Sequence, residues 1–150
     1  MEKATLSLVC DQAMLDDAFA VREAVFVQEQ RIDHAVEFDG LDQGSDHLLA
    51  KIGDQAVGTL RLRKVDDQTS KIERVAVLKS ARSLGIGALL IEAAVHRLYE
   101  QGVGDALLHA QTHALGFYKK FGFEAYGGVF DEDGIPHQAM RRRFIGDAKP

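Results

Sequence analysis

The feature that most constrains the fold is a glycine-bearing turn between an extended segment and a helical one. Residues 74–77 are typical of a strand end, and Gly85-Ile86-Gly87 opens a helical pattern of apolar residues that ends near Gly102. The first turn of a helix exposes unpaired N–H groups and the positive end of its dipole, and glycine lets a phosphate approach the backbone. The turn therefore predicts an α/β chain with an anion site, to which Arg82 adds a positive side chain.

Other interpretations of the two glycines stay open at this point. They are also compatible with a tight strand-to-helix turn that binds nothing. A dinucleotide-binding fingerprint needs glycine or alanine at position 90, where Leu90 stands, and a Walker loop needs Gly-Lys followed by serine or threonine, which the sequence lacks. Both nucleotide-binding interpretations are therefore weakened.

The hydrophobic periodicity predicts the order strand, helix, three strands, helix, strand, helix and two strands. The expected strands are residues 4–10, 47–52, 56–65, 71–77, 105–111, 123–127 and 137–144, and the expected helices are residues 11–30, 85–102 and 113–121. Because a helix separates strand 71–77 from strand 105–111, we expect these two strands to be parallel and joined by a right-handed crossover.

Composition indicates one domain over residues 1–150. A chain of 150 residues with 46% hydrophobic content can bury one continuous core, and no Pro-rich or Ser/Gly-rich linker divides it. A net charge of -5 argues against nonspecific binding to nucleic acid or to an anionic membrane. With no signal peptide, no run of about 20 apolar residues and a single cysteine, a cytoplasmic location without disulfides is expected.

The remaining charged motifs indicate neither a metal nor nucleic acid. The six histidines show no metal-ligand spacing, so no metal is expected. The run Arg141-Arg142-Arg143 resembles a small nucleic-acid patch, but strand alternation places Arg142 on the face opposite its neighbours. A solvated strand edge is the favoured interpretation of this run.

Two motifs resemble those of the GNAT superfamily of N-acyltransferases. Residues 82–87 match the superfamily's pyrophosphate loop, Q/R-x-x-G-x-G/A, without a departure. Residues 111–123 are similar to N-x-x-A-x-x-F/L-Y-x-x-x-G-F, with Gln111 in place of the usual asparagine. With the element order, the resemblance covers nearly the whole chain. It implies an α/β (α+β) fold with a mixed, mostly antiparallel central sheet flanked by helices, in which a splayed parallel strand pair forms a CoA cleft.

The resemblance also implies how acetyl-CoA is held. Its pantetheine arm would lie between strand 74–77 and strand 105–111, and the amides of residues 82–88 would surround its pyrophosphate. The residues implied in cofactor binding are Val75, Ala76, Val77, Arg82, Ser83, Leu84, Gly85, Ile86, Gly87, Ala88, Gln111, Ala114, Phe117, Tyr118 and Lys120.

The implied activity is transfer of the acetyl group to a primary amine by direct attack in a ternary complex. A thioester is already activated, so the enzyme must chiefly position the amine, remove a proton and stabilise the oxyanion and the leaving thiolate. The resemblance makes Tyr118 the general acid toward the CoA sulfur and Glu73 the general base. Tyr118 could instead be a helix residue anchored by its hydroxyl, and Glu73 a strand residue paired with Arg61 or Arg63.

Further alternatives concern the base, the acceptor and the assembly. Glu29 and Glu37 remain alternative bases. The first helix, the acidic connection 31–46 and the last two strands are expected to build a pocket for a small-molecule or peptide amine, and the acidic connection favours a cationic one. Arg22, Phe26 and His137 are the residues expected to line this pocket.

A second hypothesis is an acyl-CoA-binding sensor or regulatory module without transfer activity, which the substitution at Gln111 supports. The exposed final strands could allow a homodimer by edge pairing.

Overall fold

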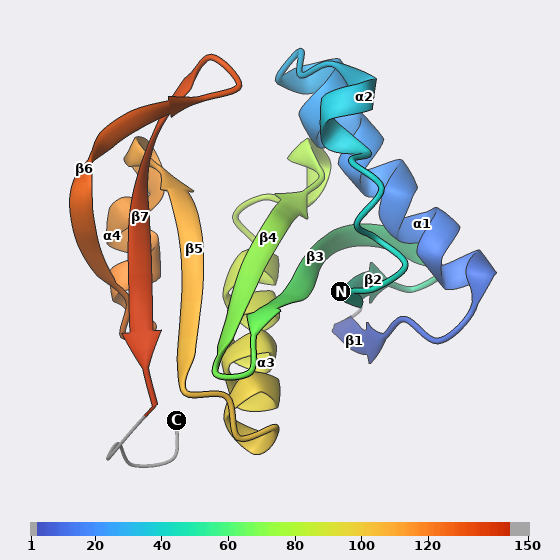
Figure 1. Ribbon diagram of the computed structural model, residues 1–150. Coiled ribbons are helices and arrows are strands. Elements are labelled where there is room, and N and C mark those ends of the chain that lie inside the picture. Colours follow the sequence, from blue (N-terminus) through green and yellow to red (C-terminus); the bar gives the residue numbers. More distant parts are fainter. Residues whose placement is uncertain (1–2, 145–150) are drawn as a thin grey trace.

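The computed structural model describes residues 3–144, and residues 1–2 and 145–150 lie outside the described part. The strands form one seven-stranded sheet in the order β1-β2-β3-β4-β5-β7-β6 (Figure 1). Their bounds are β1 Ala4–Leu8, β2 Asp46–Ile52, β3 Gln55–Asp66, β4 Thr69–Val77, β5 Asp105–Gln111, β6 Glu124–Glu132 and β7 Ile135–Arg143. The pair β4 and β5 is parallel, and the other five pairings are antiparallel. The predicted mixed, mostly antiparallel sheet is confirmed.

Helices flank the sheet on both faces, with α1 and α2 on one side and α3 and α4 on the other (Figure 1). The helical segments are α1 Gln12–Arg22, the π-helix η1 Glu23–Glu29, α2 His34–Glu37, the 3-10 turn η2 Lys79–Ala81, α3 Ile86–Glu100, the 3-10 turn η3 Thr112–Ala114 and α4 Leu115–Lys119. The predicted element order is confirmed except for α2, a short helix within the connection 31–46 that was expected to be irregular.

The first helix begins where the sequence predicts but changes from α to π geometry in its second half. Asp11 caps α1, since its Oδ1 accepts from the amide of Met14 at 2.8 Å. The prediction of one helix to about residue 30 is correct in extent. However, residues 23–29 follow the wider π geometry, with the amide of Gln30 bonded to the carbonyl of Val25 at 3.0 Å.

Strand β3 is buried on both faces, which explains its mixed composition. Leu60 and Leu62 belong to the main hydrophobic core together with Leu90 and Leu98 of α3. Arg61 lies between the two leucines in sequence, so it faces the opposite side of the sheet, where it is fully buried. A buried guanidinium requires ionic partners, and those partners lie at the candidate site.

Strands β4 and β5 separate after a short parallel ladder. Their pairing runs only from Thr69 opposite Asp105 to Ile72 opposite Leu108. A β-bulge follows in β4 at Arg74, whose φ of 57° lies in the left-handed region. The bulge adds twist and turns β4 away from β5, and the two strands diverge toward their carboxyl ends (Figure 1). The predicted splayed parallel pair is present.

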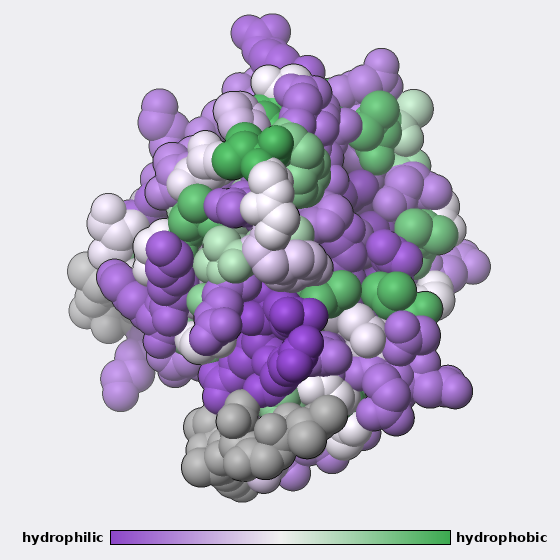
Figure 2. All heavy atoms as spheres, turned by 60° about the vertical axis from the view of Figure 1, so that its left-hand side comes forward, coloured by the Kyte–Doolittle hydropathy of each residue, from purple (hydrophilic) through white to green (hydrophobic). Residues whose placement is uncertain are grey.

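The outer strands β1 and β6 form the edges of the sheet. Most side chains of β6 are exposed, including Val129 at 63%. Figure 2 brings the side of the molecule with β6 forward. Apolar residues form small groups there among mostly hydrophilic ones. The homodimer stays a prediction.

Candidate active site

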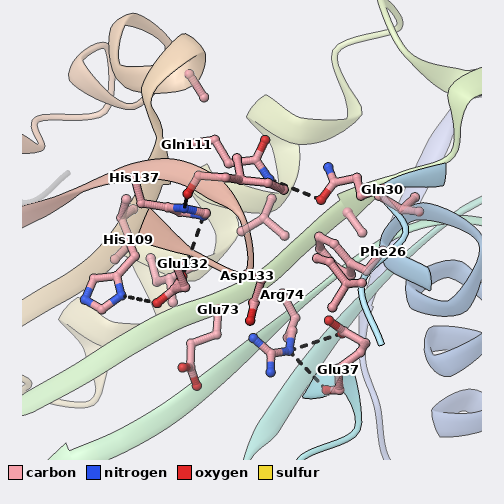
Figure 3. Close-up of a pocket in the computed structure, with 18 of the residues that line it drawn as sticks. Phe26, Gln30, Glu37, Glu73, Arg74, His109, Gln111, Glu132, Asp133 and His137 are labelled. Carbon is pink, nitrogen blue, oxygen red and sulfur yellow. Dashed lines mark hydrogen bonds and ion pairs between the residues drawn. The ribbon is translucent and has the colours of Figure 1, made fainter. Parts of the chain in front are cut away.

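A cavity of about 450 Å³ opens where β4 and β5 diverge. Its walls come from η1, the ends of β4 and β5, the loop after β4, α4 and the β6–β7 hairpin. Phe26 and Gln30 project from one side, and His137 and His109 lie on the other (Figure 3). The cavity therefore joins segments that are far apart in the sequence.

The loop after β4 has the form required of an anion site. Gly85 precedes α3 with a φ of 78°, which glycine adopts without strain. The first bond of the helix runs from the amide of Leu89 to the carbonyl of Gly85 at 3.1 Å. The amides of Ile86, Gly87 and Ala88 are therefore left without a partner inside the helix. The positive end of the α3 dipole faces the same region.

Phe117 of α4 restricts the space above this loop. A Cβ atom added at Gly87 would lie 3.4 Å from Cζ of Phe117. A side chain at position 87 would therefore touch the ring of Phe117, and glycine avoids this contact.

Arg82 is turned toward Glu29 at the end of η1. Its Nη1 and Nη2 donate to the two carboxylate oxygens at 2.6 and 2.7 Å, and its Nε donates to the carbonyl of Val77 at 3.1 Å. The hydrogen bond from Arg82 lowers the pKa of Glu29. The sequence placed Arg82 in the phosphate loop, but it gave no sign that a carboxylate on another element occupies the guanidinium.

Gln111 makes a second contact with the end of η1. Its Nε2 donates to Oε1 of Gln30 at 3.2 Å, and its Oε1 lies 2.8 Å from Nε2 of His113. Glu29 and Gln30 are adjacent, so the end of η1 is tied both to the loop after β4 and to the end of β5. We call these two contacts, Glu29 with Arg82 and Gln30 with Gln111, the η1 clamp.

Tyr118 of α4 lines the cavity and is partly buried. Its ring packs edge to face against Phe117, at 5.0 Å between centroids, and against Phe123 at 6.4 Å. Burial raises the pKa of the Tyr118 phenol to about 12. The hydroxyl is therefore protonated at neutral pH and is available to donate.

Glu73 lines the cavity as well, but three cations hold its carboxylate. Oε1 lies 2.7 Å from Nε of Arg63 and 2.9 Å from Nη2 of Arg61, and Oε2 lies 3.4 Å from Nζ of Lys71. Burial would raise the pKa of Glu73, but these three partners hold it at about 2. A carboxylate with so low a pKa is a weak base, so the contacts favour the interpretation that Glu73 pairs with the neighbouring arginines.

Arg22 does not lie in the cavity, and its expected place in the acceptor pocket was wrong. Its side chain is 1% exposed and donates to Glu37 at 2.9 Å and to Asp42 at 2.7 Å. The guanidinium also lies over the rings of Phe19 and Phe38, at 5.2 and 4.9 Å from their centroids. Arg22 therefore connects α1 to the connection that follows η1.

Other acids of the connection 31–46 are paired with arginines too. Arg61 contacts Asp39 at 2.9 Å and Asp42 at 3.1 Å, and Arg74 contacts Glu37 at 3.1 Å and Asp39 at 3.2 Å. These carboxylates neutralise buried or half-buried guanidinium groups rather than facing an acceptor. The argument for a cationic acceptor from the acidity of this connection therefore loses its basis.

His137 of β7 lines the cavity and belongs to a cluster of side chains that the sequence did not reveal. Its Nδ1 lies 2.7 Å from the carbonyl oxygen of Ile135, and its Nε2 lies 3.6 Å from Oε2 of Glu132. Oε1 of Glu132 lies 2.9 Å from Nδ1 of His109 on β5. The hairpin turn between β6 and β7 and the pairing of β5 with β7 bring these three side chains together.

The predicted site residues divide into those that line the cavity and those that do not. Predicted residues that line the cavity are Phe26, Glu73, Val75, Ala76, Val77, Arg82, Gln111, Ala114, Tyr118 and His137. Predicted residues that do not line it are Arg22, Ser83, Leu84, Gly85, Ile86, Gly87, Ala88, Phe117 and Lys120.

Two members of the second group have definite places elsewhere. Ile86 is 2% exposed, so only its backbone could serve a ligand. Lys120 lines a separate cavity of about 670 Å³ together with Arg141, Arg142 and Arg143. Arg142 there donates to the carbonyl of Phe121 at 2.6 Å.

No group of three or more potential metal ligands occurs within residues 3–144. No helix in the described part of the chain has the length and apolar character needed to cross a membrane.

The sheet is thus mixed and opens between two parallel strands, with the start of a helix at the open end. The sequence profile of the Acetyltransferase (GNAT) domain matches residues 10–144. An uncharacterized N-acetyltransferase of Bacillus subtilis (strain 168), YjcF, is 39% identical over 133 residues, which cover 88% of this chain and 94% of YjcF. The chain belongs to the GNAT acetyltransferase family.

Solved structures agree with this assignment. An acyl-CoA N-acyltransferase from Pseudomonas aeruginosa is 31% identical and superposes with a TM-score of 0.84, over 93% of this chain and 99% of that protein. Escherichia coli ElaA is 29% identical and superposes with a TM-score of 0.85, over 94% of this chain and 100% of ElaA. The similarity to both therefore extends over almost the whole fold.

Proposed function

We propose that the protein is an N-acetyltransferase that transfers the acetyl group of acetyl-CoA to a primary amine by direct attack in a ternary complex. One observation carries the proposal. A single cavity contains the open edge of β4, Arg82 of the phosphate loop, the protonated Tyr118 and the ring of His137. Cofactor holding, proton donation and acceptor binding can therefore occur in one place.

The described residues fit acetyl-CoA, which supplies the activated acetyl thioester. Beyond Ile72 the edge of β4 has no ladder with β5, so the backbone of Val75 and the amide of Val77 are open to the pantetheine arm, while the carbonyl of Val77 accepts from Nε of Arg82. The amides at the start of α3 would hold the pyrophosphate, and glycine at positions 85 and 87 adds no side chain there. The name of the Pseudomonas relative, an acyl-CoA N-acyltransferase, supports the same cofactor class.

Tyr118 would donate its hydroxyl proton to the leaving sulfur. A phenol whose pKa is about 12 stays protonated until the sulfur acquires charge in the transition state. No nucleophilic side chain of the protein is needed, because the amine attacks the thioester directly. Phe26 and His137, on opposite walls, would confine the acceptor between them (Figure 3).

The test is a thiol-release assay with acetyl-CoA and a panel of primary amines, with the acetylated product identified by mass. Enzyme-dependent release that requires an amine supports the proposal. Tight binding of acetyl-CoA with no turnover above background would instead establish the sensor hypothesis. A thermal-shift series with CoA, NAD and ATP adds a check, since stabilisation by NAD or ATP but not by CoA would contradict the cofactor assignment.

A further inference from the structure

His137 has a defined tautomer in this structure. A carbonyl oxygen can only accept a hydrogen bond, so the 2.7 Å contact with Ile135 places a proton on Nδ1 of His137. In the neutral ring the lone pair is therefore on Nε2. The residue is 7% exposed and lines the cavity, so this nitrogen is confined to the site.

A carboxylate is placed to stabilise the ring once it is protonated. Oε2 of Glu132 lies 3.6 Å from Nε2 of His137, while Oε1 of Glu132 is 2.9 Å from Nδ1 of His109. The His137 ring also stacks on Phe130, with centroids 6.1 Å apart and planes inclined by 24°. The ring is thus fixed in orientation, with an anion beside the nitrogen that would gain the proton.

The carboxylates that the sequence offered as bases are less suited. Three cations hold Glu73 at a pKa of about 2. Both oxygens of Glu29 are bonded to Arg82, and the pKa of Glu29 is lowered by that hydrogen bond. Oε2 of Glu37 lies between Arg22 and Arg74, at 2.9 and 3.1 Å, in the interior. An amine could reach Glu73 or Glu29 only by displacing a guanidinium or an ammonium. Burial raises the pKa of Glu37, but its side chain is only 2% exposed and two arginines already hold Oε2.

We propose that Nε2 of His137 is the base that takes the proton from the acceptor amine, with Glu132 as its positioning residue. The proposal rests on the proposed acetyltransferase function. One N–H bond of the substrate ammonium breaks and an N–H bond forms at Nε2. The freed lone pair forms the C–N bond as the C–S bond breaks.

Tyr118 accounts for the other two proton transfers of the reaction. Tyr118 protonates the leaving sulfur and regains a proton from the nitrogen, which sheds its second one on becoming an amide. The proton on His137 passes to water. The titratable and charged groups that line the cavity together with His137 are Glu29, Glu37, Lys71, Glu73, Arg74, Arg82, His109, His113, Tyr118, Glu132 and Asp133.

The test uses His137→Asn in the full-length protein, because the Asn amide can still donate to the carbonyl of Ile135. We expect kcat/KM for an alkyl amine at pH 7 to fall by about 100-fold, as for loss of a general base, with the KM for acetyl-CoA unchanged. The deficit should shrink as pH rises toward 10, because an alkyl amine, with a pKa near 10.4, then arrives increasingly deprotonated. His96→Asn, at an exposed histidine on α3, is the matched control and should match the wild type.

The outcomes separate the two proposals. If kcat/KM of His137→Asn falls by the same factor at every pH, His137 has a structural role. If kcat/KM equals that of the wild type at every pH, His137 has no role. Either result overturns the assignment of His137 as the general base. If the wild type binds acetyl-CoA but acetylates no amine in the panel, the proposed function itself fails. If His137→Asn does not fold, Glu132→Gln serves instead, with an expected loss of about tenfold that again shrinks at high pH. A Glu132→Gln protein with unchanged kcat/KM would contradict the proposal.

Discussion

Arg82 and Glu29 face each other fork to fork, with nitrogen–oxygen distances of 2.6 and 2.7 Å, although they lie 53 residues apart in the sequence. Arg82 belongs to the predicted pyrophosphate loop, and Glu29 ends η1. A bidentate guanidinium pairs equally well with a phosphate as with a carboxylate. A phosphate that binds at the start of α3 would therefore compete with Glu29 for the same donors.

Glu29→Gln is accordingly expected to tighten CoA binding by about two- to fivefold, the range of one exposed ion pair. The gain should be measured by calorimetry at low salt, and it should disappear when Arg82 is replaced by alanine. Glu92→Gln, at an exposed glutamate on α3, controls for the change in net charge. A dissociation constant that is unchanged or higher in Glu29→Gln would show that the carboxylate does not compete with the cofactor.

Gly87→Asp is expected to weaken CoA binding by about tenfold or more, because a negative charge enters the space proposed for two phosphates. Gly87→Ala is the matched control, since its Cβ would lie at 3.4 Å from Phe117 and adds no charge. Calorimetry on both folded proteins distinguishes the effect of charge from that of size. The same CoA affinity in Gly87→Asp as in Gly87→Ala would remove the phosphate-loop assignment.

Tyr118→Phe is expected to lower kcat by about 100-fold, near the lower end for general acid catalysis, because a CoA thiolate is a fair leaving group without help. The affinity for acetyl-CoA should stay nearly constant, since the ring contacts with Phe117 and Phe123 are kept. Steady-state kinetics and a melting curve are measured together. Wild-type turnover in Tyr118→Phe would end the general-acid assignment, and the proton would then come from water or from the amine.

Glu73→Gln is expected to change the acid stability of the fold. The pKa of Glu73 in the folded protein, about 2, lies below the 4.5 of an unperturbed glutamate. The stabilisation is therefore complete above about pH 4.5 and is lost as pH falls toward 2. Urea unfolding across this window should show the wild type losing about 3 kcal/mol more than Glu73→Gln. If the free energy of unfolding falls equally in the two proteins over this window, the three cations do not lower the pKa of Glu73.

Arg22→Met is expected to destabilise the protein by about 3–5 kcal/mol, because it leaves buried Glu37 short of a partner. Arg143→Met, at a side chain that is 63% exposed, should change stability by about 0.5 kcal/mol or less. Urea titrations of the two variants and the wild type give the comparison. Similar small changes in both variants would contradict a structural role for the buried ion pair.

Local patterns predicted the parts of the site that are local in sequence. The loop before α3 and Tyr118 lie within short motifs, so the glycine-bearing turn and the resemblance to the GNAT motifs were enough to locate them. Arg22 was misplaced because its partners lie 15 and 20 residues away, and no periodicity relates a helix residue to acids in an irregular connection. The cluster of His109, Glu132 and His137 escaped prediction for a similar reason. It depends on the register of β7 against both β5 and β6, which strand patterns alone do not fix.

The π-helical geometry of η1 has a consequence for the η1 clamp. The wider π turns take up one residue more than α turns would over the same rotation, because each amide bonds to the carbonyl five residues before it. A segment one residue shorter could therefore continue as α-helix with Glu29 and Gln30 still directed toward Arg82 and Gln111. Removal of a second residue would rotate both side chains by about 100° and break both contacts of the η1 clamp. The direction of these two side chains thus depends on the number of residues in the segment as well as on their identity.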